Sequence, residues 1–270
     1  MSAREPITIR ASSFGSLFDC PARWIAIHRL KQRMPSRANA AIGTAIHAGT
    51  AVYDGERVRG QTPSVSAAMD AAAAAAKDPG YEVDWADDKP DAAVDIATSL
   101  TQRYAEHESP KHTFVAVEAS VDSLHLTDIG IVLTGTTDRV YADESTGELG
   151  IGDLKSGKTI VRTDGTVDTK GHAAQVGVYE LVASAAIGRP VSAPAKIIGL
   201  QTNKTPDKQR IGCGEIAGAR EPLLGDEHHT GLLHTAARLV HGEIDAWGNP
   251  KSMMCHQRYC PNWNTCFWRK

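Results

Sequence analysis

The stretch Leu149-Gly-Ile-Gly-Asp-Leu-Lys155 decides the expected fold. Its apolar residues predict a strand, and because side chains alternate along a strand, Asp153 and Lys155 lie on the same face. The sequence holds two more Asp-x-Lys triplets, Asp87–Lys89 and Asp168–Lys170, but both lie in polar loops. An aspartate and a lysine on one face are typical either of a surface ion pair or of a catalytic centre.

A second carboxylate lies fifteen residues earlier, in Leu133-Thr-Gly-Thr-Thr-Asp138-Arg. This segment belongs to a strand predicted over 129–141, and the turn residues of 143–147 lead from it into the strand with Asp153. Neighbouring strands can bring Asp138 and Asp153 together. Two carboxylates beside one lysine form an oxygen-rich site for Mg²⁺ or Mn²⁺.

Hydrophobic periodicity indicates an α/β chain. Helices are predicted over about 12–28, from 38 through 47 and beyond, and over 64–77, 91–106, 173–187 and 225–247. Strands are predicted over 113–121, 129–141, 149–155 and 196–201. Three strands in succession form a meander, and the helices before and after them indicate a mixed central sheet flanked by helices.

Composition agrees with a soluble globular protein. Of 270 residues, 41% are hydrophobic and 23% are charged, which suits one large domain better than several small ones. No apolar run approaches the ~20 residues needed to span a bilayer, and the first residues lack the features of a signal peptide. We therefore expect a cytoplasmic protein with no membrane anchor, in a reducing compartment.

The net charge of −3 conceals an uneven distribution. Residues 1–60 carry nine Lys and Arg residues against four acidic ones, and residues 250–270 carry four basic residues and no acidic one. Residues 70–110 instead carry ten acidic residues and three basic ones. Phosphate binding needs a local positive surface rather than a positive total, so a nucleic-acid partner stays open, although ordinary surface charge explains the pattern as well.

Six short motifs follow one another along the chain. In order, they are the segment from Ser12 to Cys20-Pro-Ala-Arg-Trp24, then Gly43-Thr-Ala-Ile-His47, Glu118, Gly135-Thr-Thr-Asp138-Arg139, Asp153-Leu-Lys155 with Gly157, and Gln175-Val-Gly-Val-Tyr179. Their identity and order resemble the PD-(D/E)XK nuclease superfamily, in the branch that includes the nuclease domain of the bacterial RecB helicase–nuclease, CRISPR-associated exonucleases and phage exonucleases. Glu118 is explained equally well as a solvent-facing strand residue.

The resemblance covers nearly the whole chain and implies a single nuclease domain over 1–270 with a restriction-endonuclease-like core. Within it, 1–110 forms a helical part, 111–205 the catalytic sheet and helix, and 206–270 the C-terminal helix and cysteine segment. The implied activity is that of a divalent-metal-dependent DNA exonuclease, in which a metal-activated water attacks a phosphodiester in line. A catalytically silent DNA-binding or assembly factor of the same fold is the alternative.

The resemblance also implies roles for individual residues. The implied ligands of Mg²⁺ or Mn²⁺ are three side chains and one backbone carbonyl group, those of His47, Asp138, Asp153 and Leu154. Lys155 would orient the water and stabilise charge in the transition state, while Gln175 and Tyr179 would support the site and the scissile strand. Taken alone, His47 is more typical of a structural histidine, and Gln175 of a surface helix residue.

The cysteines suggest a second metal centre. Three of them lie close together in a segment with little hydrophobic periodicity: Cys255, Cys260 and Cys266. In a reducing compartment such a group indicates a metal rather than disulfides, and Cys20 is the candidate for a fourth thiolate. The resemblance implies a [4Fe–4S] cluster joining the two ends of the chain. The spacing from Cys255 to Cys260 is Cys-x4-Cys, whereas the relatives often have Cys-x2-Cys. Zn²⁺ therefore remains an alternative metal, and His256 could replace one of its thiolate ligands. Cys213 has no evident partner and is interpreted as an incidental thiol.

Basic residues near the two chain ends are candidates for contacts with a DNA strand. They are Arg23, Arg29, Lys31, Arg33 and Arg258. The expected partner is a single- or double-stranded DNA end, with a recombination or helicase protein as a further partner and no membrane. The expected setting is DNA recombination or repair, or phage DNA metabolism.

Overall fold

The computed structural model describes residues 5–86 and 89–269. Asp87, which belongs to an alternative Asp-x-Lys triplet, and the basic residues Arg4 and Lys270 lie outside the described residues. Within the described ranges, no helix combines the length and the apolar character needed to cross a membrane.

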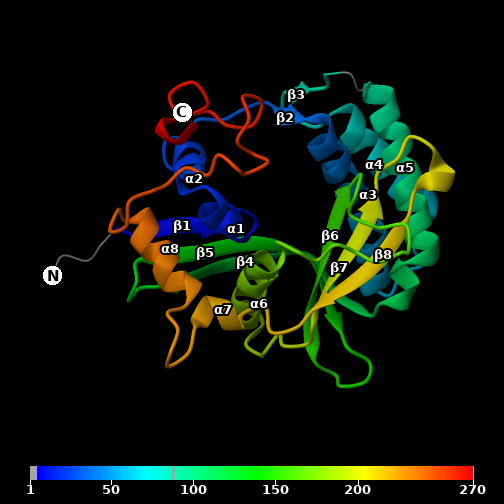
Figure 1. Cartoon of the computed structure of the whole chain (residues 1–270). Coiled ribbons are helices and arrows are strands. Elements are labelled where there is room, and N and C mark those ends of the chain that lie inside the picture. Colours follow the sequence, from blue (N-terminus) through cyan, green and yellow to red (C-terminus); the bar gives the residue numbers. More distant parts are fainter. Residues whose placement is uncertain (1–4, 87–88, 270) are drawn as a thin grey trace.

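A six-stranded mixed sheet forms the centre of the structure (Figure 1). Strands β4 (Phe114–Leu126), β5 (Ile131–Ala142) and β6 (Leu149–Gly157) pair antiparallel in succession. Their side chains repeat with a period of two, and the turn after β5 contains Gly147 with a positive φ of 73°. The predicted meander is confirmed: β4 and β6 end five and two residues beyond their predicted ends, whereas β5 begins two residues later and ends one residue later than predicted.

Three further strands complete the sheet. β7 (Ala195–Gln201) runs parallel to β6, and β8 (Ile211–Ile216) pairs antiparallel with β7 at the sheet edge. β1 (Ile7–Arg10) runs parallel to the first half of β5, whose second half pairs with β6. The sequence predicted β7 but neither β1 nor β8, because short strands have too few residues to establish a period.

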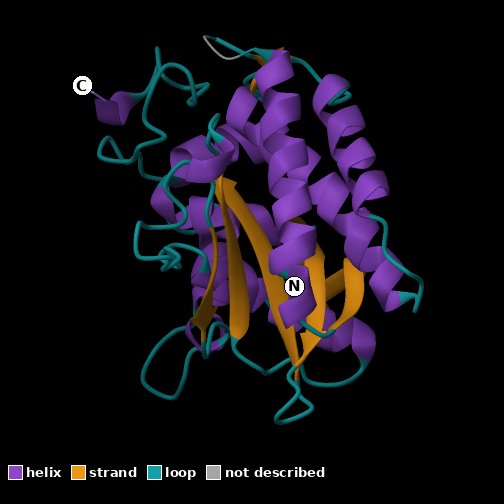
Figure 2. Cartoon of the chain, turned by 90° about the vertical axis from the view of Figure 1, so that its right-hand side faces the viewer, coloured by secondary structure: helices purple, strands orange, loops and turns teal. Residues whose placement is uncertain are grey.

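Helices α3 (Ala38–Val58), α4 (Val65–Lys77) and α5 (Pro90–His107) form a layer over β6 and β7 (Figure 2). All three were predicted, and the Ser64 hydroxyl caps α4 by accepting a hydrogen bond from the amide of Ala67. The core beneath this layer contains side chains of α3, α5 and the two strands: Ile46, Leu100, Leu154 and Ile198. This layer positions the residues of α3 against the meander.

Helices α1 (Ala11–Asp19), α2 (Pro21–His28) and α6 (Ala173–Ile187) contribute to a second core against β1 and β5. The single helix expected over 12–28 is divided at Cys20, because Pro21 lacks the amide hydrogen needed to continue α1 and instead begins α2. The prediction of α6 is confirmed at both ends, and Gly188 ends it with a positive φ of 72°.

The helix predicted over 225–247 is wrong. The structure has a short helix α7 (Glu221–Leu224), a loop, and then α8 (Leu232–Val240). Gly225 has a φ of 75°, and the Asp226 carboxylate accepts hydrogen bonds from the amides that follow it, so this segment forms a turn instead of a helix. The apolar period belongs to α8 alone.

The C-terminal segment after α8 consists of turns that pack on the N-terminal helices. Figure 1 shows this red segment beside the blue helix α2. The carbonyl of Trp247 accepts a hydrogen bond from the amide of Ala22, and the Ser252 hydroxyl donates to Asp19.

The remaining regular elements are a two-stranded sheet of β2 (Ser36–Arg37) and β3 (Val83–Asp84), and 3-10 turns at Ser109–Lys111, Pro206–Lys208 and Phe267–Arg269. The division of the chain into 1–110, 111–205 and 206–270 stays a prediction.

Candidate active site

His47 of α3 and Asp138 of β5 meet at the face of the sheet covered by α3. His47 Nδ1 lies 3.2 Å from Asp138 Oδ1, and the amide of Leu154 donates a hydrogen bond of 2.8 Å to Asp138 Oδ2. The Asp138 carboxylate is therefore held from two sides, by a side chain of the helical layer and by the backbone of β6. The structure brings together these two predicted ligands, which are far apart in the sequence.

Glu118 of β4 joins this pair. Ligand atoms of His47, Glu118 and Asp138 lie within 4.8 Å of one another. Glu118 has a φ of 46°, a left-handed conformation that costs a residue other than glycine on the order of 1–3 kcal/mol. One imidazole nitrogen and two carboxylates form a donor set that suits Mn²⁺ and also accepts Mg²⁺. The sequence left Glu118 open between a ligand and a solvent-facing residue, and its position in this cluster favours the ligand.

Asp153 and Lys155 lie on one face of β6, as the strand period predicted. Lys155 Nζ forms an ion pair with Asp153 Oδ2, and the aspartate is only 1% exposed. The pairing of Arg139 with Gly152 places Asp138 and Asp153 in neighbouring positions on adjacent strands. Asp153 is thus next to the three-residue cluster, with its carboxylate directed toward Lys155.

The two aspartates have pKa values shifted in opposite directions. Burial raises the pKa of Asp153 to about 6, with the charge of Asp138 adding to the effect and Lys155 opposing it. Burial also acts to raise the pKa of Asp138, but His47 and Lys155 outweigh it and hold that pKa below its ordinary value. Burial lowers the pKa of His47, and the Asp138 carboxylate overcomes this so that it is raised. Opposed shifts in paired titratable groups are typical of catalytic sites.

Gln175 and Tyr179 of α6 lie beside the site and contact each other. Gln175 Nε2 donates a hydrogen bond of 3.1 Å to the Tyr179 hydroxyl. The tyrosine ring packs against Gly135 of β5, where an added Cβ would lie 2.7 Å from ring carbon Cε1. Burial raises the pKa of Tyr179, and the charges of Asp153 and Asp138 add to it, so the hydroxyl stays protonated.

A buried network supports the site from behind. Arg139 Nε and the Tyr104 hydroxyl each donate a 2.6 Å hydrogen bond to Asp54 Oδ2, and all three residues are fully buried. Arg139 Nη1 also donates to the carbonyl of Asp138 at 2.7 Å. Sequence reasoning identified Arg139 as part of a motif but missed Asp54, although a buried arginine requires a carboxylate partner somewhere in the chain.

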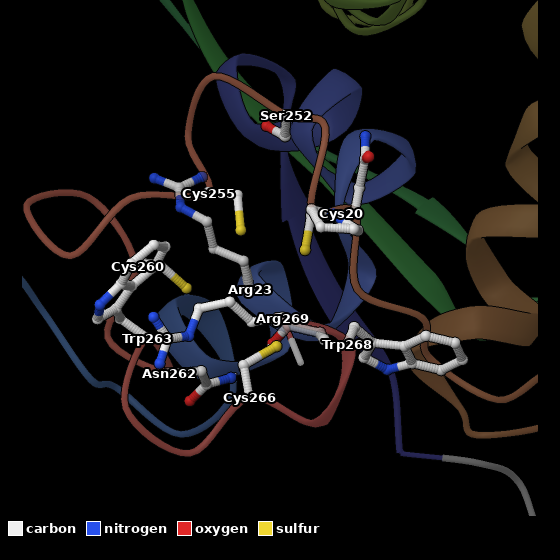
Figure 3. A pocket seen from close by; sticks show the side chains of 13 residues that line it. Cys20, Arg23, Ser252, Cys255, Cys260, Asn262, Trp263, Cys266, Trp268 and Arg269 are labelled. Atoms are coloured by element: carbon white, nitrogen blue, oxygen red, sulfur yellow. Dashed lines mark hydrogen bonds between the residues drawn. The ribbon is translucent and has the colours of Figure 1, made fainter.

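The four cysteines of the expected second centre line one small cavity. Cys20, Cys255, Cys260 and Cys266 enclose about 20 Å³, and Figure 3 shows their thiols directed toward a common space. All four are free thiols, and burial raises the pKa values of Cys255 and Cys260, with neighbouring thiols adding to the effect. Four convergent sulfur atoms fit either a [4Fe–4S] cluster or Zn²⁺. His256 is not among the described residues that line this cavity.

A basic groove of about 660 Å³ adjoins the cysteine cavity. Its described lining has no acidic side chain and six cationic ones: Arg10, Arg23, Lys31, Arg33, Arg37 and Arg258. Four of the five predicted DNA contacts are thus brought together. Arg29 is the exception, because its guanidinium group donates to the Val240 carbonyl and lines another pocket. The sequence missed Arg10 and Arg37, the second of which pairs with Asp84.

The groove and the metal-ligand cluster are connected through α3. Arg37 and Ala40 line the groove at the first turn of this helix, and His47 follows two turns later. At 1.5 Å per residue, the rise from Ala40 to His47 is about 10 Å. His47 thus lies on the same helix as the groove lining, about two turns further along.

Comparison with known proteins agrees with this geometry. A model of the PD-(D/E)XK nuclease superfamily matches residues 9–267, a range that contains the ligand cluster, the Asp153–Lys155 pair and all four convergent cysteines. No curated protein matches the chain.

Proposed function

Because the chain belongs to the PD-(D/E)XK nuclease superfamily, we propose that it is a DNA exonuclease that hydrolyses phosphodiester bonds with Mg²⁺ or Mn²⁺. The superfamily points to a metal-dependent nuclease, and a nuclease fold implies DNA as the substrate. The observation that carries the proposal is the position of the Asp153–Lys155 ion pair beside the His47, Glu118 and Asp138 ligand atoms.

His47, Asp138 and Asp153 hold the divalent ion in this proposal, with the Leu154 carbonyl as a further ligand and Glu118 as an added one. When bound, the ion supplies charge neutralisation at the phosphate and lowers the pKa of a water molecule. The Leu154 amide keeps Asp138 oriented through Oδ2, while Oδ1 faces His47 Nδ1, so these two atoms would turn toward a shared ion. Ionisation of Asp153 is needed before its carboxylate can act as a ligand.

Lys155 has two roles in this mechanism. In the resting protein its ammonium group neutralises the buried Asp153 carboxylate. With a divalent ion held by the carboxylate, the ammonium group would be free to orient the attacking water and to stabilise the charge that develops on the phosphate oxygens. Gln175 and Tyr179 position the scissile strand, and the protonated Tyr179 hydroxyl serves as a hydrogen-bond donor.

The DNA strand lies in the basic groove. Arg23, Lys31, Arg33 and Arg258 contact phosphates there, and the electrostatic attraction is independent of base sequence. Arg29 is not part of this surface because its guanidinium group binds the Val240 carbonyl. The short distance along α3 to His47 supports a path from the groove to the ligand cluster.

A [4Fe–4S] cluster on Cys20, Cys255, Cys260 and Cys266 completes the proposal, with Zn²⁺ as the second candidate. The convergence of four free thiols in one cavity supports a metal centre of this kind. Its role is structural, because it joins α2 to the C-terminal segment, and its binding energy then becomes folding energy. We place the protein in the cytoplasm, in DNA recombination or repair or in phage DNA metabolism, with a recombination or helicase protein as its partner.

Exonuclease action is tested by comparing linear and circular DNA. End-labelled linear single strands, linear duplexes and closed circular single strands are incubated with the protein and Mg²⁺. We expect the linear substrates to be degraded from their ends while circles persist. Digestion of circles at the same rate would show an endonuclease, and binding of DNA without any cleavage would show a catalytically silent member of the fold.

A further inference from the structure

A second group of metal-ligating side chains lies outside the nuclease site. Glu108 follows the last residue of α5, His112 follows the 3-10 turn Ser109–Lys111, and Cys213 lies on the edge strand β8. One ligand atom from each of the three residues lies within 4.8 Å of the others. The thiol without an evident partner in the sequence thus has two ligand-bearing neighbours.

The two buried members of this group contact each other. Glu108 is 3% exposed and His112 is 7% exposed, and His112 Nε2 lies 3.0 Å from Glu108 Oε1. The second ring nitrogen, Nδ1, is buried and has no hydrogen-bond partner among the described residues. Because Nε2 is the nitrogen that faces Glu108, it is the ring atom that can share an ion with the carboxylate, and Nδ1 lies on the other side of the ring.

The Lys111 ammonium group does not occupy the space between Glu108 and His112. Its ammonium group donates a 2.7 Å hydrogen bond to Glu108 Oε2, whereas His112 contacts the other oxygen, Oε1. Lys111 is also the exposed partner in this pair. A carboxylate that binds a metal through one oxygen and accepts a hydrogen bond on the other is common, because outer hydrogen bonds orient ligands.

The donor set selects the class of ion. A thiolate, an imidazole and a carboxylate suit Zn²⁺, whereas Mg²⁺ and Ca²⁺ prefer oxygen ligands alone. Zinc binds nitrogen and sulfur at about 2.0–2.3 Å, so atoms already within 4.8 Å of one another can share one ion after small side-chain rotations. Cys213 is exposed, which leaves one side of the group open to solvent.

We propose that Glu108, His112 and Cys213 bind a Zn²⁺ ion, with a water molecule as the fourth ligand. The ion joins the C-terminal end of α5 to β8, which pairs with β7 alone among the described strands. This zinc site is separate from the proposed nuclease centre and from the four convergent cysteines.

Zinc binding at this place releases a proton. An ordinary cysteine thiol titrates above neutral pH, and partial desolvation and the charge of Glu108 raise the pKa of the Cys213 thiol further. At neutral pH the metal-free protein therefore carries a protonated thiol. When the zinc–sulfur bond forms, the S–H bond breaks and its proton passes to solvent, so one proton appears for each zinc bound.

The proposal is tested by zinc titration of the full chain. The four-cysteine centre is loaded beforehand, and excess Mg²⁺ is present to occupy the oxygen-rich site. Bound zinc is counted by native mass spectrometry, proton release is followed in weak buffer, and modification of Cys213 by a thiol reagent is located by peptide mass spectrometry. We expect one zinc and one proton in the parent, and strong protection of Cys213 when zinc is bound.

Variants identify the ligands. Cys213→Ser should lose this zinc while it keeps the metal of the four-cysteine centre, and Glu108→Gln should weaken binding by about 100-fold. Lys111→Ala is the matched control, because it removes a competing cation but no ligand, and it should bind zinc at least as tightly as the parent. Equal zinc uptake by the parent and Cys213→Ser would overturn the proposal. Unchanged reactivity of Cys213 in zinc-bound parent would also overturn it, without any substitution.

Discussion

Asp153 is subject to two opposing requirements. In the proposed mechanism it must be ionised to bind a divalent ion, yet burial raises its pKa to about 6. Lys155 reduces this conflict by pairing with the carboxylate. Because the bound ion favours the ionised form further, the effective pKa of Asp153 depends on the metal concentration.

The first prediction concerns the acid limb of the pH profile. At limiting Mg²⁺, the initial rate of DNA cleavage should fall below about pH 6, approaching a tenfold decrease for each pH unit as Asp153 becomes protonated. At saturating Mg²⁺ the limb should move to lower pH, because the ion competes with the proton for the same carboxylate. A rate that stays constant from pH 7 to pH 4.5 at limiting Mg²⁺ would contradict this account.

The second prediction concerns Glu118, which combines a ligand position with a left-handed backbone. Glu118→Gln and Glu118→Gly should both require about tenfold more Mg²⁺ for half-maximal cleavage, because each loses a carboxylate. The glycine variant should unfold at higher denaturant than the glutamine variant, since glycine adopts a φ of 46° without strain and relieves about 1 kcal/mol. Equal stability of the two variants would argue against the strain.

The sequence predicted those site residues that have a local pattern. Asp153 and Lys155 follow from strand alternation, and Asp138 from its position on the neighbouring strand. Asp54 had no such signal, because it lies on α3, far from its partner Arg139 in the chain, and only tertiary packing brings the two together. Arg10 and Arg37 were missed for the same reason, since the groove forms only when β1, α2 and the C-terminal segment meet.

At the scale of elements, the contact between β5 and α6 determines how closely Tyr179 approaches the strand that carries Asp138. Gly135 allows the Tyr179 ring to approach the backbone three residues before Asp138. A side chain at this position has no room, since an added Cβ would also lie 3.2 Å from the Ala11 Cβ. The position of α6 therefore depends on one glycine of β5.

The third prediction follows from this contact. Gly135→Ala should displace Tyr179, reduce cleavage at least tenfold and lower the free energy of unfolding by about 1–3 kcal/mol. Gly157→Ala is the matched control at the end of β6, because an added Cβ there has no atom within 4 Å. Rates and denaturant midpoints are measured for both variants. Similar behaviour of Gly135→Ala and Gly157→Ala would refute the packing argument.

Elements with a clear period were predicted well. The meander and helices α3 to α6 have long apolar patterns, so their existence and order followed from the sequence. The failure over 225–247 arose because the helix was started at Gly225, although the positive φ of that glycine and the Asp226 turn delay the helix until Leu232. The pairing of β1 with β5 could not be predicted, because partner choice depends on contacts distant in the sequence.

At the scale of the whole molecule, residues of the N-terminal helices form hydrogen bonds with residues of the C-terminal segment. Asp19 accepts hydrogen bonds from the side chains of Asn249 and Ser252, and Asn262 Nδ2 donates to the Ala22 carbonyl. The C-terminal segment has little regular structure, and hydrogen bonds of this kind, including one from Arg23 to the Tyr259 carbonyl, hold it against the N-terminal helices. The same segment supplies Arg258 to the basic groove.

The fourth prediction concerns loss of the proposed cluster. Cys20→Ala, prepared without air, should lose the brown colour of an iron–sulfur protein, lower Tm by on the order of 10 °C, and weaken DNA binding. Cys213→Ser is the control and should keep the colour, because Cys213 does not line the cysteine cavity. Absorbance, iron content and thermal melting are measured together. A colourless parent with one zinc in the four-cysteine centre would exclude the iron–sulfur cluster and support the zinc alternative.

The central claim is that Asp153, with Lys155 and the neighbouring ligand atoms, forms a metal-dependent nuclease centre. The most direct test measures Mg²⁺-dependent digestion of end-labelled DNA by the parent, by Asp153→Asn and by Asp168→Asn, the last of which alters an Asp-x-Lys triplet in a loop. We predict that the parent and Asp168→Asn degrade DNA at similar rates. Asp153→Asn should be slower by about a thousandfold, equivalent to ~4 kcal/mol of transition-state stabilisation. Equal digestion by all three proteins, or no digestion by the parent, would contradict the claim.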